Sequence, residues 1–515
     1  MRRQNLFLIL LAFISAGVYL ALSASRGAVG FPLDDAWIHQ VYARNLGTRG
    51  EFAFFAGQPS AGSTAPLWTI FLAVGYFLRI DFHAWTYVVV AMLMGASVIL
   101  AGRVGERIFA TRNSQIENHF LVPSPKSQTW LFAFSLSLFT LLEWHLSWSA
   151  VSGMEIPLFV FLSLLLLERF YARERAWLLG IIGALLTLTR PEGAVLAGIV
   201  AASVIARRIE ATTKQSPTVP RGLLRFARND VMFFGFGFAF LLAPYLLFNL
   251  AVSGNIFPNT FFAKNAEYQI IIERVPFVIR YLQLLFIPFI GAQTLLIPAM
   301  LFAVFHFVKR RNFFGLIPLA WILLLPALYA LRLPVAYQHG RYEMPIIPFI
   351  VMYGIGGMFL LFERVKNFVF RATYALAPAA TLIAFWFIGA NAYATDVAII
   401  DCEMVQTARW VAQNVPRDAR VAAHDIGALG YYYDKPFIDL AGLVSPEVIP
   451  FIRDENRLRE YLFSRSTQYA IFFPDWYPAL DSDPRFARVF QTDCAVTRRE
   501  GGTNMVVYKI VLTGK

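Results

Sequence analysis

Charged residues are scarce in this chain of 515 residues. Only 15% of the residues are Asp, Glu, Lys or Arg, whereas a soluble protein carries about 25%. Hydrophobic residues make up 57% of the chain, and its mean hydropathy is +0.55. This composition excludes an ordinary soluble enzyme and indicates a polytopic α-helical membrane protein.

Cysteine is also rare. The chain has only Cys402 and Cys494, with no CxxC pair and no His/Cys cluster, which argues against a zinc-binding motif. If the region around them is extracytoplasmic, the two cysteines can form a disulfide. Equally, the two cysteines can be unrelated buried thiols.

Acidic residues are fewer than basic ones, 33 against 45, and the net charge is +12. The basic residues lie in short loops between apolar stretches, without a basic stripe that interleaves with aromatic residues. The positive-inside rule explains such loops, so we expect membrane lipids and no nucleic acid as partners.

Apolar stretches dominate residues 1–394, and residues 395–515 have an ordinary globular composition. We predict an uncleaved anchor with a cytoplasmic N-terminus, followed by a first outer loop at 26–65. The basic loops then indicate about eleven crossings. The C-terminal part is predicted to be an extracytoplasmic α/β domain, with helices at 396–414 and 455–464 and strands at 420–424, 469–473 and 505–512.

Residues 176–206 are too long for one membrane span and are interrupted at 189–193. Both ends are basic, which predicts a hairpin of two short helices that rises from the cytoplasmic side. Its tip carries Arg190 and Glu192. Charges at membrane depth must pair or face a cavity, so these residues either bind a ligand or form an ion pair that stabilises the tip.

Two adjacent aspartates, Asp34 and Asp35, follow the first apolar stretch. Carboxylates beside a bilayer usually pair, bind a cation or do chemistry. Asp34 can instead cap a helix over residues 35–46, on which Asp35, His39 and Tyr42 share one face. Glu155, in the next predicted outer loop, can be a first-turn residue that the helix dipole favours.

Cations occupy two further predicted outer loops, at Lys264 and at His339 and Arg341. Lys264 and Arg341 can snorkel to the membrane interface, and His339 can be an ordinary loop residue. Acids and cations around an outward-facing cavity nevertheless suit sugar transfer from a lipid phosphate. A carboxylate takes the proton of the attacking hydroxyl, and cations neutralise the departing phosphate.

Taken together, these segments resemble the GT-C superfamily of polyprenyl-phosphate-sugar-dependent glycosyltransferases. Within it, they are most similar to the bacterial arabinosyl/mannosyltransferase-like integral membrane proteins. The order of the motifs and their topology carry the resemblance more than any single motif. The matching segments are residues 33–38, 42–45, 62–68, 152–155, 188–193, 258–264, 339–342, 425–430 and 439–443.

The resemblance implies a GT-C-like catalytic domain at 1–394 in the bacterial inner membrane. It implies a polyprenyl-phosphate sugar as donor, inversion at the anomeric carbon, and a glycan, lipid or protein of the cell envelope as acceptor. The essential acid maps onto Asp34 or Asp35, with Asp34 as the first choice, and Glu155 assists. A divalent metal at Asp34 and Asp35 is left open. The expected substrate-binding residues are Arg190, Glu192, Lys264, His339, Arg341 and Tyr342.

Two other classes of function are alternatives. A lipid-sugar transporter or flippase predicts inverted repeats and charges near the midplane, and the sequence has no internal repeat. A non-enzymatic envelope-assembly protein would use the C-terminal domain to bind envelope polymer.

Overall fold

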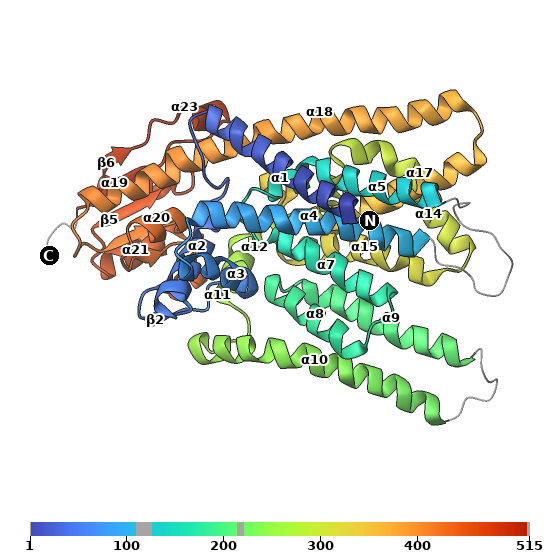
Figure 1. Cartoon of the computed structure of the whole chain (residues 1–515). Helices are drawn as coiled ribbons and strands as arrows, with labels where there is room; N and C mark the ends of the chain where they lie inside the picture. The colour runs from blue at the N-terminus through green and yellow to red at the C-terminus, as the bar shows by residue number, and fades with distance from the viewer. Residues whose placement is uncertain (1, 110–125, 214–220, 512–515) are drawn as a thin grey trace.

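The computed structural model describes residues 2–109, 126–213 and 221–511, and helices dominate it (Figure 1). Seven helical segments are long and apolar enough to cross a membrane, and five shorter apolar helices accompany them. The chain therefore has the architecture of a multi-pass membrane protein, while the predicted count of about eleven crossings stays a prediction. The seven segments are Arg3–Ser25, Phe82–Phe109, Asn229–Ser253, Ala292–Lys309, Phe313–Arg332, Tyr337–Arg364 and Phe368–Asn414.

The α-helices of the described residues up to 400 follow here in chain order. They are α1 (Arg2–Ser25), α2 (Asp34–Arg49), α3 (Pro66–Phe77), α4 (Phe82–Phe109), α5 (Lys126–Leu142), α6 (Trp144–Ser149), α7 (Ile156–Tyr171), α8 (Ala176–Thr189), α9 (Gly193–Thr213), α10 (Arg221–Ser253), α11 (Asn259–Glu267), α12 (Gln269–Arg274), α13 (Phe277–Phe286), α14 (Ile297–Lys309), α15 (Ile317–Arg332), α16 (Tyr337–Gly340), α17 (Ile347–Arg364) and α18 (Phe368–Ile400).

The hairpin predicted for residues 176–206 is present as α8 and α9, which lie side by side (Figure 1). Helix α8 ends at Arg190, whose backbone is extended with φ −155° and ψ 136°. Pro191 follows, and the residue before a proline is disfavoured in the helical region. The chain therefore turns at the position where the sequence carries its two charges.

The segment at residues 26–65, predicted to be the first outer loop, folds around helix α2. This helix ends at Gly50, which has a left-handed φ of 72° and donates its N–H to the Leu46 carbonyl. Glycine adopts this conformation without the steric cost that a Cβ imposes. A short antiparallel pair follows, β1 (Ala53–Phe55) and β2 (Gln58–Pro59). One side of α2 packs on α3 and another on the C-terminal domain, so most of its side chains are buried.

The C-terminal domain has the predicted α/β fold, with one five-stranded sheet in the order β4-β3-β5-β7-β6. Strand β3 is parallel to β4 and β5, whereas β7 is antiparallel to β5 and β6. The predicted strands and the predicted helix at 455–464 are present, but β4 and β6 were not predicted. The elements are β3 (Val421–Ala423), α20 (Gly427–Tyr432), β4 (Ile438–Asp439), α21 (Glu455–Ser464), β5 (Tyr469–Phe472), α22 (Pro478–Asp481), β6 (Phe486–Gln491), α23 (Ala495–Arg499) and β7 (Val506–Ile510).

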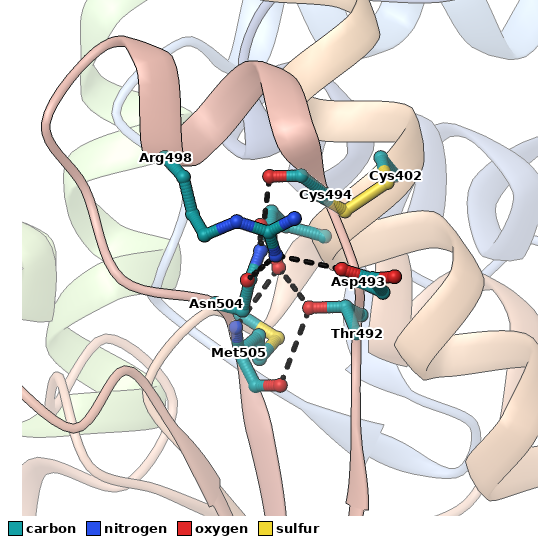
Figure 2. The surroundings of a disulfide bond; sticks show 8 residues. Cys402, Thr492, Asp493, Cys494, Arg498, Asn504 and Met505 are labelled. Atoms are coloured by element: carbon teal, nitrogen blue, oxygen red, sulfur yellow. Dashed lines mark hydrogen bonds and ion pairs between the residues drawn. A yellow bond between two sulfur atoms is a disulfide. The ribbon is translucent and has the colours of Figure 1, made fainter.

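The predicted domain boundary at residues 394/395 falls inside a helix. Helix α18 continues through a π-helical turn, η5 (Asp401–Val405), into α19 (Gln406–Asn414). Cys402 of this turn forms a disulfide with Cys494 (Figure 2). The neighbouring Glu403 is buried and accepts hydrogen bonds from the Asn504 side chain at 2.7 Å, the Met505 N–H at 2.9 Å and the Thr492 hydroxyl. The long helix is thus fastened to the sheet covalently and by hydrogen bonds.

Candidate active site

The two aspartates open helix α2 and point to different partners. Leu33 is extended, with φ −147° and ψ 139°, and the helix begins at Asp34 without a side-chain cap. The alternative that Asp34 caps its own helix is therefore wrong. Both carboxylates remain available for partners elsewhere in the chain.

Asp35 lies against two cations from distant segments. Its Oδ2 accepts a hydrogen bond of 2.5 Å from Arg341 Nη2 and lies 3.9 Å from Lys264 Nζ. Both cations also donate to the Tyr342 hydroxyl at 3.0 Å. Burial raises the pKa of Asp35, but the charges of Arg341 and Lys264 outweigh it, and the pKa ends below its ordinary value. Asp35 is therefore an ionised carboxylate that holds two cations together.

Asp34 caps a helix of the C-terminal domain. Its Oδ2 accepts the Gly427 N–H at 2.6 Å and its Oδ1 accepts the Ala428 N–H at 2.8 Å, at the start of α20. Burial raises the pKa of Asp34 to about 6, although the two backbone hydrogen bonds oppose this shift. Asp34 thus joins the start of α2 to the C-terminal domain, and its proton exchanges close to neutral pH.

Glu155 lies in a second buried group with His39 and Arg190. Its Oε2 is 3.2 Å from His39 Nε2, and its Oε1 is 3.6 Å from Arg190 Nη1. Burial raises the pKa of Glu155, but the close contact with His39 and the charge of Arg190 lower it to about 2. His39 stands one helical turn after Asp35, so α2 carries both groups.

Tyr342 joins these two groups. The Arg190 guanidinium lies over its ring at 4.8 Å from the centroid, while Arg341 and Lys264 bind its hydroxyl. We call Asp35, Glu155, Arg190, Lys264, Arg341 and Tyr342 the acid–cation cluster. Five segments far apart in the sequence contribute to it. Such convergence of charge in a membrane protein is typical of a functional site.

Two predicted binding residues do not belong to the acid–cation cluster: Glu192 lies at its margin and His339 lies outside it. Glu192 Oε2 is 3.7 Å from Arg190 Nε, so it pairs with the hairpin-tip arginine. His339 Nε2 instead contacts Asp396 Oδ2 of α18 at 2.8 Å, and its ring packs edge-on against Trp144 and Trp148. Among the described residues, the hydrogen bond and ring contacts of His339 lead away from the acids of the cluster, so its role in binding stays a prediction.

Residues 425–430 lie against the first two aspartates, which their positions in the sequence did not predict. Asp425 Oδ2 is buried and has no hydrogen-bond partner in the part of the chain that the structure describes. Burial, followed by the charges of Asp34 and Asp35, raises the pKa of Asp425 well above its usual range. A Cβ at Gly427 would lie 2.1 Å from the Asp34 carbonyl oxygen, so only glycine fits this approach. The sequence signal that could have revealed this site is the aspartate Asp425 two positions before Gly427.

Glu343 was also missed, although it directly follows the predicted Tyr342. It is fully buried, and neither carboxylate oxygen has a hydrogen-bond partner among the described residues. Glu143 is equally buried but satisfied, because it accepts from His145, Gln293 and the Leu146 N–H. An acid inside an apolar stretch was the signal for both residues.

A divalent metal at Asp34 and Asp35 finds little support in the donor set. Within residues 2–109, 126–213 and 221–511, no group of three His, Cys, Asp or Glu side chains could hold a metal ion. Asp34 already accepts two backbone N–H groups, and Asp35 already faces two cations. The donor set of these two carboxylates therefore gives no support for a metal ion, and a metal at this place stays a prediction.

Comparisons with known proteins agree with this architecture. The chain aligns with ArnT from Cupriavidus metallidurans bound to undecaprenyl phosphate over 99% of its own length and 98% of that chain, with a TM-score of 0.57 and 14% identity. Apo ArnT aligns over 98% of each chain, with a TM-score of 0.54 and 14% identity. ArnT is a GT-C glycosyltransferase. The chain has the GT-C fold.

Two comparisons at the level of sequence say less about the function of the chain. Residues 402–508 match a family described as a domain of unknown function, DUF8728, which covers most of the C-terminal domain. No curated protein matches the chain. The predicted resemblance to the GT-C superfamily is thus confirmed through the fold, whereas the roles of individual site residues stay predictions.

Proposed function

We propose that this GT-C protein is an inverting glycosyltransferase that moves a sugar from a polyprenyl phosphate to an extracytoplasmic acceptor of the cell envelope. The observation that carries the proposal is the contact of Asp35 with Arg341 and Lys264, beside Asp34. ArnT, which shares the fold, has been crystallised with undecaprenyl phosphate. The acceptor is a glycan, lipid or protein, and the donor is a hexosyl or pentosyl polyprenyl phosphate.

The cations supply the donor-phosphate site in this proposal. Arg341 and Lys264 already converge on one carboxylate oxygen, and Arg190 lies behind them across Tyr342. A phosphate oxygen can replace that carboxylate oxygen as their partner without a change of geometry. The same cations then neutralise the charge that develops on the phosphate as the sugar leaves. Asp35 and Glu155 keep the cations in place before the donor arrives.

Asp34 is the base in this proposal. The acceptor hydroxyl oxygen attacks the anomeric carbon, and the bond from that carbon to the phosphate oxygen breaks with its electron pair moving to the phosphate. The hydroxyl proton passes to Asp34. A carboxylate with a pKa of about 6 accepts a proton near neutral pH more readily than the strongly paired Asp35. Attack on the face opposite the phosphate inverts the anomeric carbon.

The test compares three Asp→Asn variants in membranes that contain equal amounts of protein. Asp34→Asn and Asp35→Asn change the site, and Asp418→Asn changes an exposed aspartate of the C-terminal domain. Transfer of radiolabelled sugar is measured from a panel of undecaprenyl- and decaprenyl-phosphate sugars. We expect the first two variants to lose transfer and the third to keep it. Wild-type turnover in both site variants would show that the proposal is wrong.

The proposed topology places the N-terminus in the cytoplasm and residues 395–515 outside the bacterial inner membrane, above the transmembrane catalytic domain at 1–394. The disulfide between Cys402 and Cys494 supports this side, because oxidising compartments favour disulfides. A phosphatase fused after residue 511 should be active, and a fluorescent protein that requires the cytoplasm should be dark there. The opposite pair of results would reverse the topology.

A further inference from the structure

A cavity lined by basic residues lies at the opposite end of the molecule from the candidate active site. It has a volume of about 100 Å³ and lies where α14 and α17 end. Figure 1 shows these two helices toward the end of the bundle away from the C-terminal domain. The residues that line the cavity are Phe302, Phe305, His306, Lys309, Arg310 and Arg364.

The charge of this cavity is entirely positive. Lys309, Arg310 and Arg364 form no ion pair within the described residues, and no acidic side chain lines the cavity. The Arg364 guanidinium lies over the Phe302 ring at 5.2 Å, and the Lys309 ammonium lies over the Phe305 ring at 5.9 Å. These three side chains are exposed to solvent, and Glu363 beside Arg364 offsets part of their charge, yet the cavity itself presents only positive charge to an anion.

His306 gives an independent indication of a ligand. Its residue is only 8% exposed, and its Nε2 is buried without a hydrogen-bond partner among the residues that the structure describes. A buried nitrogen without a partner costs free energy that a hydrogen bond from a ligand recovers. Basic residues at helix C-termini are favoured by the helix dipole, which explains some of the charge. The dipole explains neither the cavity nor the unsatisfied His306.

The surroundings favour a lipid over a free ion. Leu301 and Phe305 of α14 are 62% and 58% exposed, and they continue the apolar surface of this helix away from the cavity. An acyl chain can lie along such a surface while its headgroup phosphate enters the basic cavity. Basic pockets between transmembrane helices on the side away from the outer face are a known place for anionic headgroups.

We propose that this cavity binds the headgroup of an anionic phospholipid. The cations hold the phosphate, and a turn of the His306 ring toward the cavity gives its buried Nε2 a headgroup oxygen or hydroxyl as partner. The site is separate from the acid–cation cluster, so it does not depend on the proposed glycosyl transfer.

Native mass spectrometry of the full chain in detergent tests this proposal. Phosphatidylglycerol and phosphatidylcholine are titrated onto wild type and onto the triple variant Lys309→Gln/Arg310→Gln/Arg364→Gln. The matched control removes three exposed cations that do not line the cavity, Arg173→Gln/Arg175→Gln/Arg311→Gln. The single variant Arg364→Gln serves if the triple variant does not accumulate. Each measurement is repeated with an excess of inorganic phosphate.

We expect wild type and control to retain phosphatidylglycerol in preference to phosphatidylcholine. The triple variant should lose that occupancy at least about tenfold, and Arg364→Gln should lose part of it. Equal phosphatidylglycerol binding by wild type and the cavity variants would overturn the proposal, as would an absence of preference over phosphatidylcholine. Displacement of phosphatidylglycerol by inorganic phosphate would assign the cavity to a free anion and also overturn it. Loss of sugar transfer in an Asp34 or Asp35 variant leaves this result unchanged.

Discussion

Arg341 donates a hydrogen bond of 2.5 Å to Asp35, although 306 positions separate the two residues in the chain. Arg341 is almost fully buried, whereas the Asp35 side chain is 31% exposed. The arginine thus fixes the carboxylate from the protein side, and part of the carboxylate stays exposed on the other side. This one contact joins the start of α2 to the start of the candidate membrane span Tyr337–Arg364.

Replacement of Arg341 should weaken binding of the lipid phosphate. We expect Arg341→Gln to bind undecaprenyl phosphate about 10- to 100-fold more weakly, because a charge-assisted hydrogen bond to the phosphate is lost. Binding is measured by native mass spectrometry of the full chain. Arg274→Gln removes an exposed arginine of α12 as the control and should bind as wild type does. Unchanged affinity in Arg341→Gln would remove this residue from the donor site.

The pH dependence of transfer should report Asp34. Only its ionised form accepts a proton, and burial raises the pKa of Asp34 to about 6, so kcat/KM should rise with pH and level off above about 6. Asp35 has a lowered pKa and stays ionised throughout this range. In Asp34→Asn the residual activity should lose this acid limb. If kcat/KM still rises with pH in Asp34→Asn but no longer does so in Asp35→Asn, the base is Asp35.

Transfer should rise with pH, whereas the raised pKa of Asp34 makes the stability of the folded protein fall as pH rises. The folded protein keeps the Asp34 proton to a higher pH than the unfolded chain does, so its contribution to stability is full below about 4 and declines as pH rises through about 6. The difference in melting temperature between wild type and Asp34→Asn should change over this pH window. A difference that stays constant from pH 4 to 7 would contradict the assigned shift.

Gly427→Ala should separate α20 from the start of α2. The added Cβ would lie 2.1 Å from the Asp34 carbonyl oxygen, so α20 must move away and weaken both hydrogen bonds to the Asp34 carboxylate. We expect a loss of about 1–3 kcal/mol in the free energy of unfolding, measured by thermal unfolding. Gly198→Ala is the matched control, because no atom lies within 4 Å of its added Cβ. Equal stability of the two variants would contradict the close approach.

Loss of the disulfide should destabilise the C-terminal domain. Cys402 and Cys494 close a loop with a sequence separation of 92, and removing such a link typically costs about 2–4 kcal/mol. The double variant Cys402→Ala/Cys494→Ala should melt at a lower temperature than wild type under oxidising conditions. A reducing agent should lower the wild-type melting temperature and leave that of the variant unchanged. A reducing agent with no effect on wild type would show that the bond does not contribute to stability.

The local elements could be predicted because their signals are local. The arms of the hairpin at α8 and α9 follow from two apolar stretches on either side of Arg190 and Pro191, and α21 coincides with the predicted helix at 455–464. Strand β4 was missed because its two residues are too few to show an alternating pattern. Strand β6 was missed because three of its six residues are exposed and polar or small, which breaks the pattern of a buried strand.

The sequence by itself determined that the chain is an apolar, multi-helical protein with an α/β C-terminal domain, and that Asp34, Asp35 and Glu155 are its notable acids. Only the tertiary structure decided which partner each acid has. Asp34 binds the N–H groups of Gly427 and Ala428, Asp35 binds Arg341 and Lys264, and Glu155 binds His39 and Arg190. Hydrophobic periodicity and turn residues act over a few positions, so they reveal helices and strands. Contacts between residues separated by hundreds of positions depend on how those elements pack, and spacing along the chain carries no record of that packing.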